Sequence, residues 1–539
     1  MKTQASTNQI TFGAAIFMVL FANLAFFHNV LQSFSGQPWA YAHALSLAVV
    51  ELCVLFSVLS LVCFHRTVKP VLVFMFILSA TTAYFMDTYN VVIDRDMIAN
   101  ALATNVAESS DLLTPTLLLY LLLLGALPSA VVFSLRIRPE TITAALRSRA
   151  VLVGSALLVS VALLFLSSGF YASFIREHKV LRYYTNPAAP IHAVYRYGAT
   201  RLADKKGALQ QIGGDAKMAP ADIERELVIM VVGETARADR FSLNGYARDT
   251  NPQLAKEDIV SFRHMSACGT STAISVPCMF AIYGRNDFSN EKADSTENLL
   301  DVLKHAGVHM LWRDNNSNSK GVADRIPTED YRSPVTNPIC DPECRDEGML
   351  AGLQGFIDRQ TRGDILIILH QMGSHGPAYF KRYPPEFRTF EPTCETSQLD
   401  SCNVAEIGNS YDNTILYTDH FLARVIALLR SNDERFETAM LYASDHGESL
   451  GESGLYLHGL PNFVAPDAQT HVPAILWFGR NYDGADLAAM RQLSDTHLSH
   501  DHIFHTLLGM FEIESDVYEP EKDLQNLAAK IAGRAREYH

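Results

Sequence analysis

Residues 268–280 combine side-chain types that could carry out a reaction. Two cysteines bracket a cluster of threonine and serine hydroxyls, and an apolar, helix-like run follows. A hydroxyl at the start of a helix faces backbone N–H groups without partners inside the helix, which suits the position to a phosphate. Such a hydroxyl is a poor nucleophile until a base or a metal ion removes its proton. The stretch therefore indicates phosphate chemistry that depends on a metal or base from elsewhere in the chain.

Metal-capable side chains directly follow apolar runs from Glu226 onward. Glu234 follows one run, and Asp445 and His446 follow another. Ligands bind at the carboxyl ends of strands in open α/β sheets, so we expect these side chains to converge. With the oxygen of Thr272 as a fourth ligand, they suit Zn²⁺ in a tetrahedral catalytic site, and Mn²⁺ is an alternative. Bound zinc would make the hydroxyl easier to deprotonate near neutral pH.

Two further histidines, His375 and His458, could hold a second metal ion, or bind the phosphate and protonate a leaving oxygen. Each candidate also has an ordinary explanation when taken alone. Glu234 could cap a helix, the threonine and serine hydroxyls could do the same, and a lone histidine is more often structural or solvated. Because the candidates follow several predicted strands together, we favour a metal-assisted phosphoryl-transfer site.

Short apolar runs alternate with helical stretches from Glu226 onward. This alternation predicts an α/β domain with a central, mostly parallel sheet and crossover helices. The expected strands are 227–232, 308–312, 365–369, 439–443 and 474–478.

The first third of the chain carries the apolar excess of a membrane protein. Each of five apolar runs approaches the ~20 residues that a helix needs to cross a bilayer: 10–31, 44–64, 70–86, 115–135 and 150–173. Lys and Arg are concentrated in alternate loops, which predicts a cytoplasmic N-terminus and an external position for everything after residue 175. Glu51 lies inside the second run, where it could mark a lipid-headgroup cavity or sit at the outer interface.

Charge and cysteine content restrict the partners and the compartment. The formal net charge of -14 argues against a nucleic-acid partner. Cys53 and Cys63 lie in apolar runs and are expected to be buried. Six further cysteines form close pairs in the sequence, and we favour disulfides over zinc sites because no nearby histidine completes a ligand set. Disulfides imply an oxidising compartment. The pairs are Cys268 with Cys278, Cys340 with Cys344, and Cys394 with Cys402.

These patterns predict three parts of the chain. Residues 1–174 form a membrane domain of five helices, and residues 226–539 form the α/β catalytic domain. Residues 175–225 connect these two domains. The first part of this segment contains tyrosines and arginines typical of a helix in the headgroup region, and the second part is a polar linker.

At the candidate site the sequence resembles the phosphoethanolamine–lipid A transferases of Gram-negative inner membranes, including the mobile colistin-resistance type. The resemblance covers nearly the whole chain and implies a periplasmic domain like those of alkaline phosphatases and sulfatases. The motifs that carry it are Gly-Glu-Thr-Ala-Arg at 233–237, Cys-Gly-Thr-Ser-Thr at 268–272, Trp-Arg-Asp-Asn-Asn at 312–316, Gly-Ser-His-Gly-Pro at 373–377, and Ser-Asp-His-Gly-Glu-Ser-Leu-Gly-Glu at 444–452, followed by Leu-His-Gly at 457–459.

The resemblance implies a role for each candidate residue. Thr272 is the nucleophile that becomes modified with phosphoethanolamine. The other roles are zinc ligation by Glu234, Asp445 and His446; contact with the phosphate or a second zinc by His375 and His458; binding of phosphoethanolamine by Thr270, Asn316 and Lys320; and lining of the donor lipid's headgroup cavity by Asn100 and Glu108. The three cysteine pairs match the family's disulfides, although some relatives have a wider spacing at Cys340 and Cys344.

The implied reaction moves phosphoethanolamine from phosphatidylethanolamine to a lipid A phosphate through a phospho-threonine intermediate. The added ammonium would lower the affinity of lipid A for cationic polymyxins. We expect a zinc-dependent monomer in the membrane, with one catalytic zinc and room for a second. The rival functions are transfer of phosphoethanolamine or phosphoglycerol to a core sugar or periplasmic glucan, a phosphatase or sulfatase, and a membrane sensor without enzymatic activity.

Overall fold

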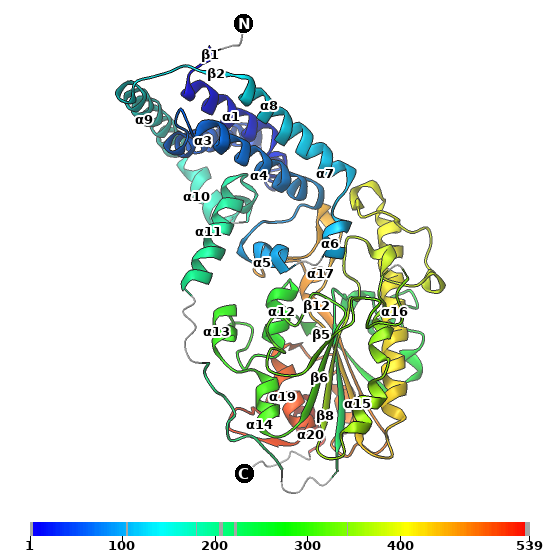
Figure 1. The fold of residues 1–539 in the computed structure, drawn as a ribbon. Helices are drawn as coiled ribbons and strands as arrows, with labels where there is room; N and C mark the ends of the chain where they lie inside the picture. The colour runs from blue at the N-terminus through cyan, green and yellow to red at the C-terminus, as the bar shows by residue number, and fades with distance from the viewer. Residues whose placement is uncertain are drawn as a thin grey trace. The chain divides into compact units, whose positions relative to one another are not determined.

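The computed structural model describes residues 4–103, 106–178, 180–203, 209–219, 224–341 and 343–533 (Figure 1). Its contacts divide the chain into two compact units. The helical unit comprises Met1–Ile98 and Leu112–Arg201, and the sheet unit comprises Ala99–Asp111 and Leu202–His539. The short segment Ala99–Asp111 therefore groups with the sheet unit, although it lies among the apolar runs in sequence. A separate bridging part at 175–225 stays a prediction.

Within the described residues, four helical stretches are long and apolar enough to cross a membrane: α3 (Ala40–Val62), α4 (Val68–Tyr89), Pro115–Ser134 and Thr143–Leu166. The third combines α7 (Pro115–Tyr120), a π-helical turn and α8 (Leu127–Ser134), and the fourth belongs to α9 (Ile142–Leu166). Helices α1 (Thr7–Phe21) and α2 (Leu24–Ser33) are bent by 52° relative to each other. The count reaches the predicted five only if this bent pair is one broken span. The remaining helices before the sheet are α5 (Arg95–Ala103), α6 (Val106–Asp111), α10 (Ser168–Glu177) and α11 (Ala188–Ala203).

Two asparagines hold the break between α1 and α2. The side chain of Asn23 donates a hydrogen bond to the backbone carbonyl of Asn186 at 2.7 Å, and the backbone N–H of Asn186 donates to Asn23 Oδ1 at 2.7 Å. The Asn186 amide donates to the carbonyls of Ala22 and Ser79, each at 2.9 Å, and accepts from the Thr82 hydroxyl at 2.9 Å. Backbone groups freed by a helix break need such partners, because the interior of a bilayer holds no water.

The sheet unit is built on a mixed sheet of eight strands in the part of the chain that the structure describes (Figure 1). In spatial order they are β13 (Leu498–Ser499), β5 (Ile259–Ser266), β12 (His471–Phe478), β9 (Glu437–Ser444), β4 (Glu226–Gly233), β8 (Ile365–His370), β6 (His309–Asp314) and β7 (Thr328–Asp330). Only β12 in this sheet pairs antiparallel with its neighbours, so the prediction of a mostly parallel sheet is confirmed. All five predicted strands are present, and β5 and the short strands β7 and β13 are additions.

The central strand β4 divides the core into two layers because its side chains alternate between the two faces of the sheet. Val228, Met230 and Val232 join one hydrophobic cluster, while the intervening apolar residues of β4 join the other. Burial on both faces explains the unbroken apolar run of this strand. The first layer is covered by α12 (Thr272–Met279), α14 (Leu299–His305), α18 (Leu487–Gln492), α19 (Asp501–Met510) and α20 (Leu524–Ile531), and the second by α15 (Leu353–Arg359) and α16 (Val404–Arg430) (Figure 1).

The remaining strands and α-helices of the described residues are short, and several 3-10 helices lie between the main elements. The short strands and α-helices are β1 (Gln4–Ala5), β2 (Arg136–Ile137), β3 (Lys217–Met218), β10 (Ser449–Leu450), β11 (Tyr456–Leu457), β14 (Ile513–Glu514), α13 (Asn290–Ser295) and α17 (Asp467–Thr470). The six closely spaced cysteines form the expected disulfides, Cys268–Cys278, Cys340–Cys344 and Cys394–Cys402.

Candidate active site

Thr272 is the first residue of α12, as the sequence predicts, and only 8 % of it is exposed. The Cys268–Cys278 disulfide links the loop before the helix to the last turn of the helix. The loop lies so close to α12 that a Cβ on Gly269 would come within 2.6 Å of the Ile274 side chain. These constraints hold the loop against α12 and so restrict the position of Thr272 at the start of the helix.

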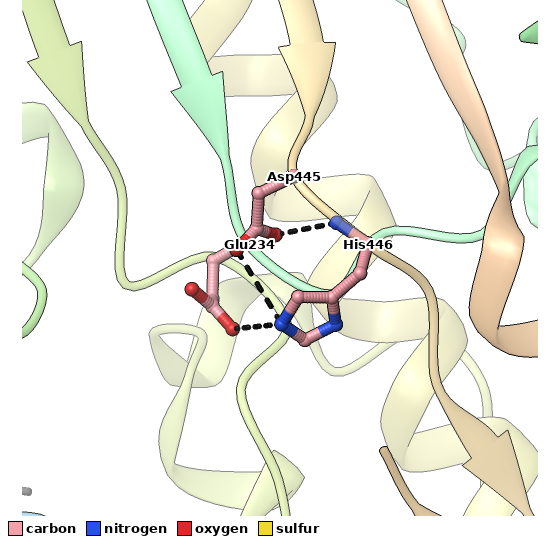
Figure 2. Close-up of side chains that lie close together, drawn as sticks. All are labelled: Glu234, Asp445 and His446. Carbon is pink, nitrogen blue, oxygen red and sulfur yellow. Dashed lines mark hydrogen bonds and ion pairs between the residues drawn. The ribbon is translucent and has the colours of Figure 1, made fainter. Parts of the chain in front are cut away.

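Glu234, Asp445 and His446 converge at the ends of β4 and β9 (Figure 2). His446 Nε2 lies 3.6 Å from Glu234 Oε1 and 3.4 Å from Asp445 Oδ2. Thr272 Oγ1 lies 3.2 Å from Glu234 Oε2 and 3.4 Å from His446 Nε2. The four residues that the sequence predicts as metal ligands are therefore gathered at one point.

His446 has the protonation pattern of a metal ligand. Its Nδ1 lies 3.0 Å from the Gly447 carbonyl oxygen, which can only accept a hydrogen bond, so Nδ1 carries the proton. The lone pair of Nε2 then faces the two carboxylates. Burial, together with the nearby His458, holds the pKa of His446 well below its usual value. The imidazole is thus neutral and available as a ligand.

Asp445 directs one oxygen into the site without a hydrogen-bond partner. Its Oδ1 accepts the backbone N–H groups of Thr235 at 3.2 Å and His446 at 2.7 Å. Its Oδ2 is buried and accepts no hydrogen bond from any residue that the structure describes. Burial also raises the pKa of the Asp445 carboxyl. A buried carboxylate oxygen beside a second carboxylate and a neutral imidazole fits a divalent cation, and the O/N donor set suits zinc.

His375 and His458 lie beside this cluster. The ring centroid of His458 is 4.3 Å from that of His446 and 5.7 Å from that of His375. Glu448, which sequence reasoning missed, lies with Oε1 3.3 Å from His458 Nδ1 and orients that ring. Among the described residues, one set of three acidic, histidine or cysteine side chains brings its ligand atoms within 4.8 Å of one another, and it is Glu234, Asp445 and His446. A second metal stays a prediction.

Asn316 and Thr270 make contacts within the protein. Asn316 Nδ2 donates to Glu234 Oε2 and to the Gln371 carbonyl, each at 2.7 Å, so this amide orients a candidate ligand. The Thr270 hydroxyl donates to the Leu460 carbonyl at 2.6 Å. Their predicted roles in binding phosphoethanolamine stay predictions.

The other predicted substrate-binding residues are only partly described. Lys320 Nζ contacts Ser317, 2.7 Å from its hydroxyl, and its positive charge is among the causes that lower the pKa of His375, after burial and His458. Asn100 lies in α5, within the segment that groups with the sheet unit. The side chain of Glu108 lies outside the described residues, so the predicted headgroup cavity is not tested.

Asp346 is a second residue that the sequence did not single out. Its buried carboxylate accepts the backbone N–H groups of Met372 at 2.8 Å and Gly373 at 3.0 Å. Gly373 has a φ of +51°, and a Cβ there would come within 2.8 Å of the Glu234 carbonyl oxygen. Asp346 therefore holds a backbone segment that packs directly against a candidate ligand. An acidic residue at the start of a short 3-10 helix carries no local signal for such a role.

Comparisons with known proteins identify the family of the chain. Residues 51–202 match the family model for phosphoethanolamine transferase EptA/EptB, and residues 226–513 match the sulfatase model. The chain is 42% identical to phosphatidylethanolamine transferase Mcr-1 of Escherichia coli over 93% of this chain and 94% of that protein. It is 40% identical to phosphoethanolamine transferase EptA of Salmonella typhimurium over 95% of each.

A solved structure matches both units. The integral membrane lipooligosaccharide phosphoethanolamine transferase A (EptA) from Neisseria meningitidis aligns with a TM-score of 0.93 and 34% identity, covering 98% of this chain and 99% of that one. A sulfatase-like domain preceded by a helical membrane region is thus shared with these enzymes. The chain belongs to the phosphoethanolamine transferase family.

Proposed function

We propose that this chain is a zinc-dependent transferase that moves phosphoethanolamine from phosphatidylethanolamine to a lipid A phosphate. The observation that carries the proposal is the position of Thr272. Its hydroxyl oxygen begins α12 and lies 3.2 Å from Glu234 Oε2 and 3.4 Å from His446 Nε2. A nucleophile at a helix N-terminus and beside a metal-ligand cluster can attack a phosphate whose charge the metal offsets. The relatives named as phosphoethanolamine transferases support the identity of the transferred group.

The first half-reaction forms a phospho-threonine. Zinc bound by Glu234, Asp445, His446 and Thr272 would act as a Lewis acid that lowers the pKa of the hydroxyl. Thr272 Oγ1 bonds to the phosphorus of phosphatidylethanolamine, its proton passes toward Glu234 Oε2, and the bond from phosphorus to the diacylglycerol oxygen breaks. His375 and His458 contact the phosphoryl oxygens, and one of them protonates the leaving oxygen.

The second half-reaction regenerates the enzyme. A phosphate oxygen of lipid A attacks the phosphorus, the bond to Thr272 Oγ1 breaks, and the hydroxyl recovers its proton from Glu234. The proton that the lipid A phosphate loses restores the histidine that protonated diacylglycerol. Thr270, Asn316 and Lys320 hold the phosphoethanolamine group during both steps. The new ammonium group partly offsets the negative charge of lipid A, which weakens the binding of cationic polymyxins.

The proposed location follows from charge and from the disulfides. Alternating Lys and Arg content supports a cytoplasmic N-terminus and a sheet unit in the periplasm of a Gram-negative cell. The three disulfides of the sheet unit suit that oxidising compartment. The first part of residues 175–225 would lie in the headgroup region and the rest would form a linker. Asn100 and Glu108 would line the cavity for the donor's headgroup. The enzyme acts as a monomer.

The rival acceptors and activities have weaker support. The Kdo(2)-lipid A phosphoethanolamine 7''-transferase of E. coli is 29% identical to this chain, whereas Mcr-1 is 42% identical, which favours a lipid A phosphate over a sugar acceptor. A phosphatase or sulfatase acting on a soluble substrate needs no membrane spans. A sensor without activity would tolerate loss of a ligand or the nucleophile, and both are retained here.

The covalent step can be tested with the purified full-length protein in detergent, supplied with zinc and phosphatidylethanolamine. We expect the wild type to release diacylglycerol and to gain the mass of one phosphoethanolamine group, and Thr272→Ala to do neither. Ser271→Ala is the matched control because it removes the adjacent hydroxyl, which forms no side-chain cap of α12. An adduct on Thr272→Ala would overturn the assignment of the nucleophile. Steady release of free phosphoethanolamine without lipid A would favour a phosphatase.

A further inference from the structure

The imidazole of His500 is almost completely buried and uses both of its nitrogens. It lies immediately before α19 and is 1 % exposed. Its Nδ1 lies 3.2 Å from the backbone nitrogen of Cys268, and its Nε2 lies 3.0 Å from the Ser444 carbonyl oxygen. An N–H group only donates and a carbonyl oxygen only accepts, so Nδ1 is the acceptor and Nε2 carries the proton. The ring is therefore held in one neutral tautomer.

The two partners of His500 belong to the two halves of the active site. Cys268 opens the loop that ends at Thr272, the nucleophile. Ser444 ends β9 and is followed directly by Asp445 and His446, two of the proposed ligands. One side chain from a third part of the chain thus joins the nucleophile loop to the metal-binding turn.

Ser275 makes a second connection between the same segments. Its hydroxyl donates to the backbone carbonyl of Asp445, and its oxygen accepts the N–H of Gly269 at 3.3 Å. The hydroxyl oxygen also lies 3.4 Å from His500 Nδ1. Helix α12 is therefore tied to the metal-binding turn by its own side chain, and His500 packs against that tie.

The competing explanation is that His500 only stabilises the fold. His505 is an example of a buried histidine with such a role. This histidine lies on α19, is also 1 % exposed, and accepts the backbone N–H of Glu519 at its Nδ1 with a distance of 3.0 Å. Glu519 precedes α20 and is not part of the site. The two histidines are equally buried, lie five residues apart at or in α19, and each accepts a backbone N–H at Nδ1, but only His500 bonds to segments that carry the proposed reaction.

We propose that His500 is a positioning residue that sets the distance between the Thr272 hydroxyl and the proposed zinc ligands. This inference rests on the proposed function. In-line attack requires the nucleophile and the metal-bound phosphate in one fixed geometry, and a displacement of about 1 Å can cost about 100-fold in rate. Groups that orient metal ligands typically change metal affinity or activity by about 10–100-fold when they are lost.

Two substitutions distinguish the hydrogen bond at Nδ1 of His500 from the hydrogen bond at Nε2. His500→Asn places an amide oxygen where Nδ1 lies, so it keeps the bond to Cys268 and loses the bond to Ser444. His500→Gln places an amide nitrogen where Nε2 lies, so it keeps the bond to Ser444 and loses the bond to Cys268. His505→Asn and His505→Gln are the matched controls. Each full-length variant is measured for zinc affinity by competition with a chelator, for diacylglycerol release at saturating zinc, and for thermal unfolding.

For His500→Asn we expect zinc affinity to fall by about 10-fold or more, because the ligand turn loses its support. For His500→Gln we expect zinc affinity within about twofold of the wild type, but a kcat that falls by about 10–100-fold with little change in KM. The two His505 variants should match the wild type in both measurements, whatever their melting temperatures.

The proposal is overturned if the His500 variants behave like the His505 variants. It is also overturned if both His500 variants lose affinity and rate only in proportion to their melting temperatures. A wild type that binds zinc but releases no diacylglycerol would overturn the proposed function instead. In that case, a lower zinc affinity of His500→Asn than of His500→Gln would still show that His500 supports the metal-binding turn.

Discussion

The two units each bury a cluster of polar side chains, and the two clusters differ in how completely they are satisfied. In the helical unit, Asn186 is fully buried, its amide makes three hydrogen bonds, and its backbone exchanges two more with Asn23. In the sheet unit, Asp445 is equally buried, but its Oδ2 accepts no hydrogen bond from the described residues. The hydrogen bonds of the asparagine cluster are supplied by the protein itself, whereas the carboxylate cluster leaves one oxygen available to a ligand.

This difference indicates that the asparagine cluster stabilises the fold and that the carboxylate cluster binds a ligand. A buried polar group without a partner costs about 1–3 kcal/mol, so it is retained where a ligand completes it. The asparagine cluster satisfies the backbone at a helix break, where a bilayer offers no water. The carboxylate cluster keeps buried negative charge that a divalent cation can neutralise.

The largest expected effect is that of Asp445→Asn, a neutral and nearly isosteric change. Because it removes a ligand, we expect transferase activity to fall by at least about 100-fold and the stabilisation by zinc to disappear. Without zinc, we expect the variant to melt at a higher temperature than the wild type, because it no longer buries an uncompensated charge. Thermal unfolding after chelation, with and without added zinc, measures both effects.

A zinc-free Asp445→Asn that melts below the zinc-free wild type would remove the distinction between the clusters. It would mean that the protein already satisfies the carboxylate. Retained stabilisation by zinc would show that Asp445 is not a ligand.

A smaller effect is expected for Asn186→Ala, the corresponding change in the complete cluster. The carbonyls of Ala22 and Ser79 would lose their donor, so we expect the helical unit to be destabilised by about 1–3 kcal/mol, with zinc affinity unchanged. Thermal unfolding in detergent, followed by zinc titration of the folded protein, tests this. Thr185→Ala removes a hydroxyl bonded to the Arg182 carbonyl and should cost less than about 0.5 kcal/mol. Equal effects of the two variants would contradict the importance of the asparagine cluster.

The smallest effect concerns pH and a buried group outside both clusters. Burial lowers the pKa of His505 to about 4, so the unfolded chain, with a pKa of about 6.5, takes up a proton first as the pH falls. His505 therefore reduces stability as the pH drops from about 6.5 toward 4, by about 1.4 kcal/mol per unit.

His505→Asn keeps the acceptor for Glu519 but cannot titrate. We expect any stability deficit of this variant at pH 7.5 to shrink by roughly 2 kcal/mol at pH 5, measured as the difference from the wild type. A deficit that stays constant between these pH values would show that His505 does not titrate abnormally.

Much of the sheet could be predicted from the sequence, because strands buried on both faces appear as continuous apolar runs. Strand β5 was missed for a local reason. Its pairing with β12 shifts between Val472 and Ala474, so Phe262 and Met265 face the core with two residues between them. The irregularity interrupts the alternation that would have revealed a half-buried strand.

The candidate ligands were predictable for the same reason, because Glu234, Asp445 and His446 each follow a strand end. The break at Asn23 was not, since its main partner, Asn186, lies 163 residues away in sequence. His500 is a similar case. Its contacts with Cys268 and Ser444 depend on how α19 packs against the sheet, and no local pattern encodes that packing.

The most direct test of the central claim is mass spectrometry of lipid A from cells that produce the wild type or Thr272→Ala in equal amounts. The account predicts lipid A carrying phosphoethanolamine only in cells with the wild type. Modified lipid A in cells with Thr272→Ala would contradict Thr272 as the nucleophile. Unmodified lipid A in both, from a wild type that still forms the covalent adduct, would contradict lipid A as the acceptor.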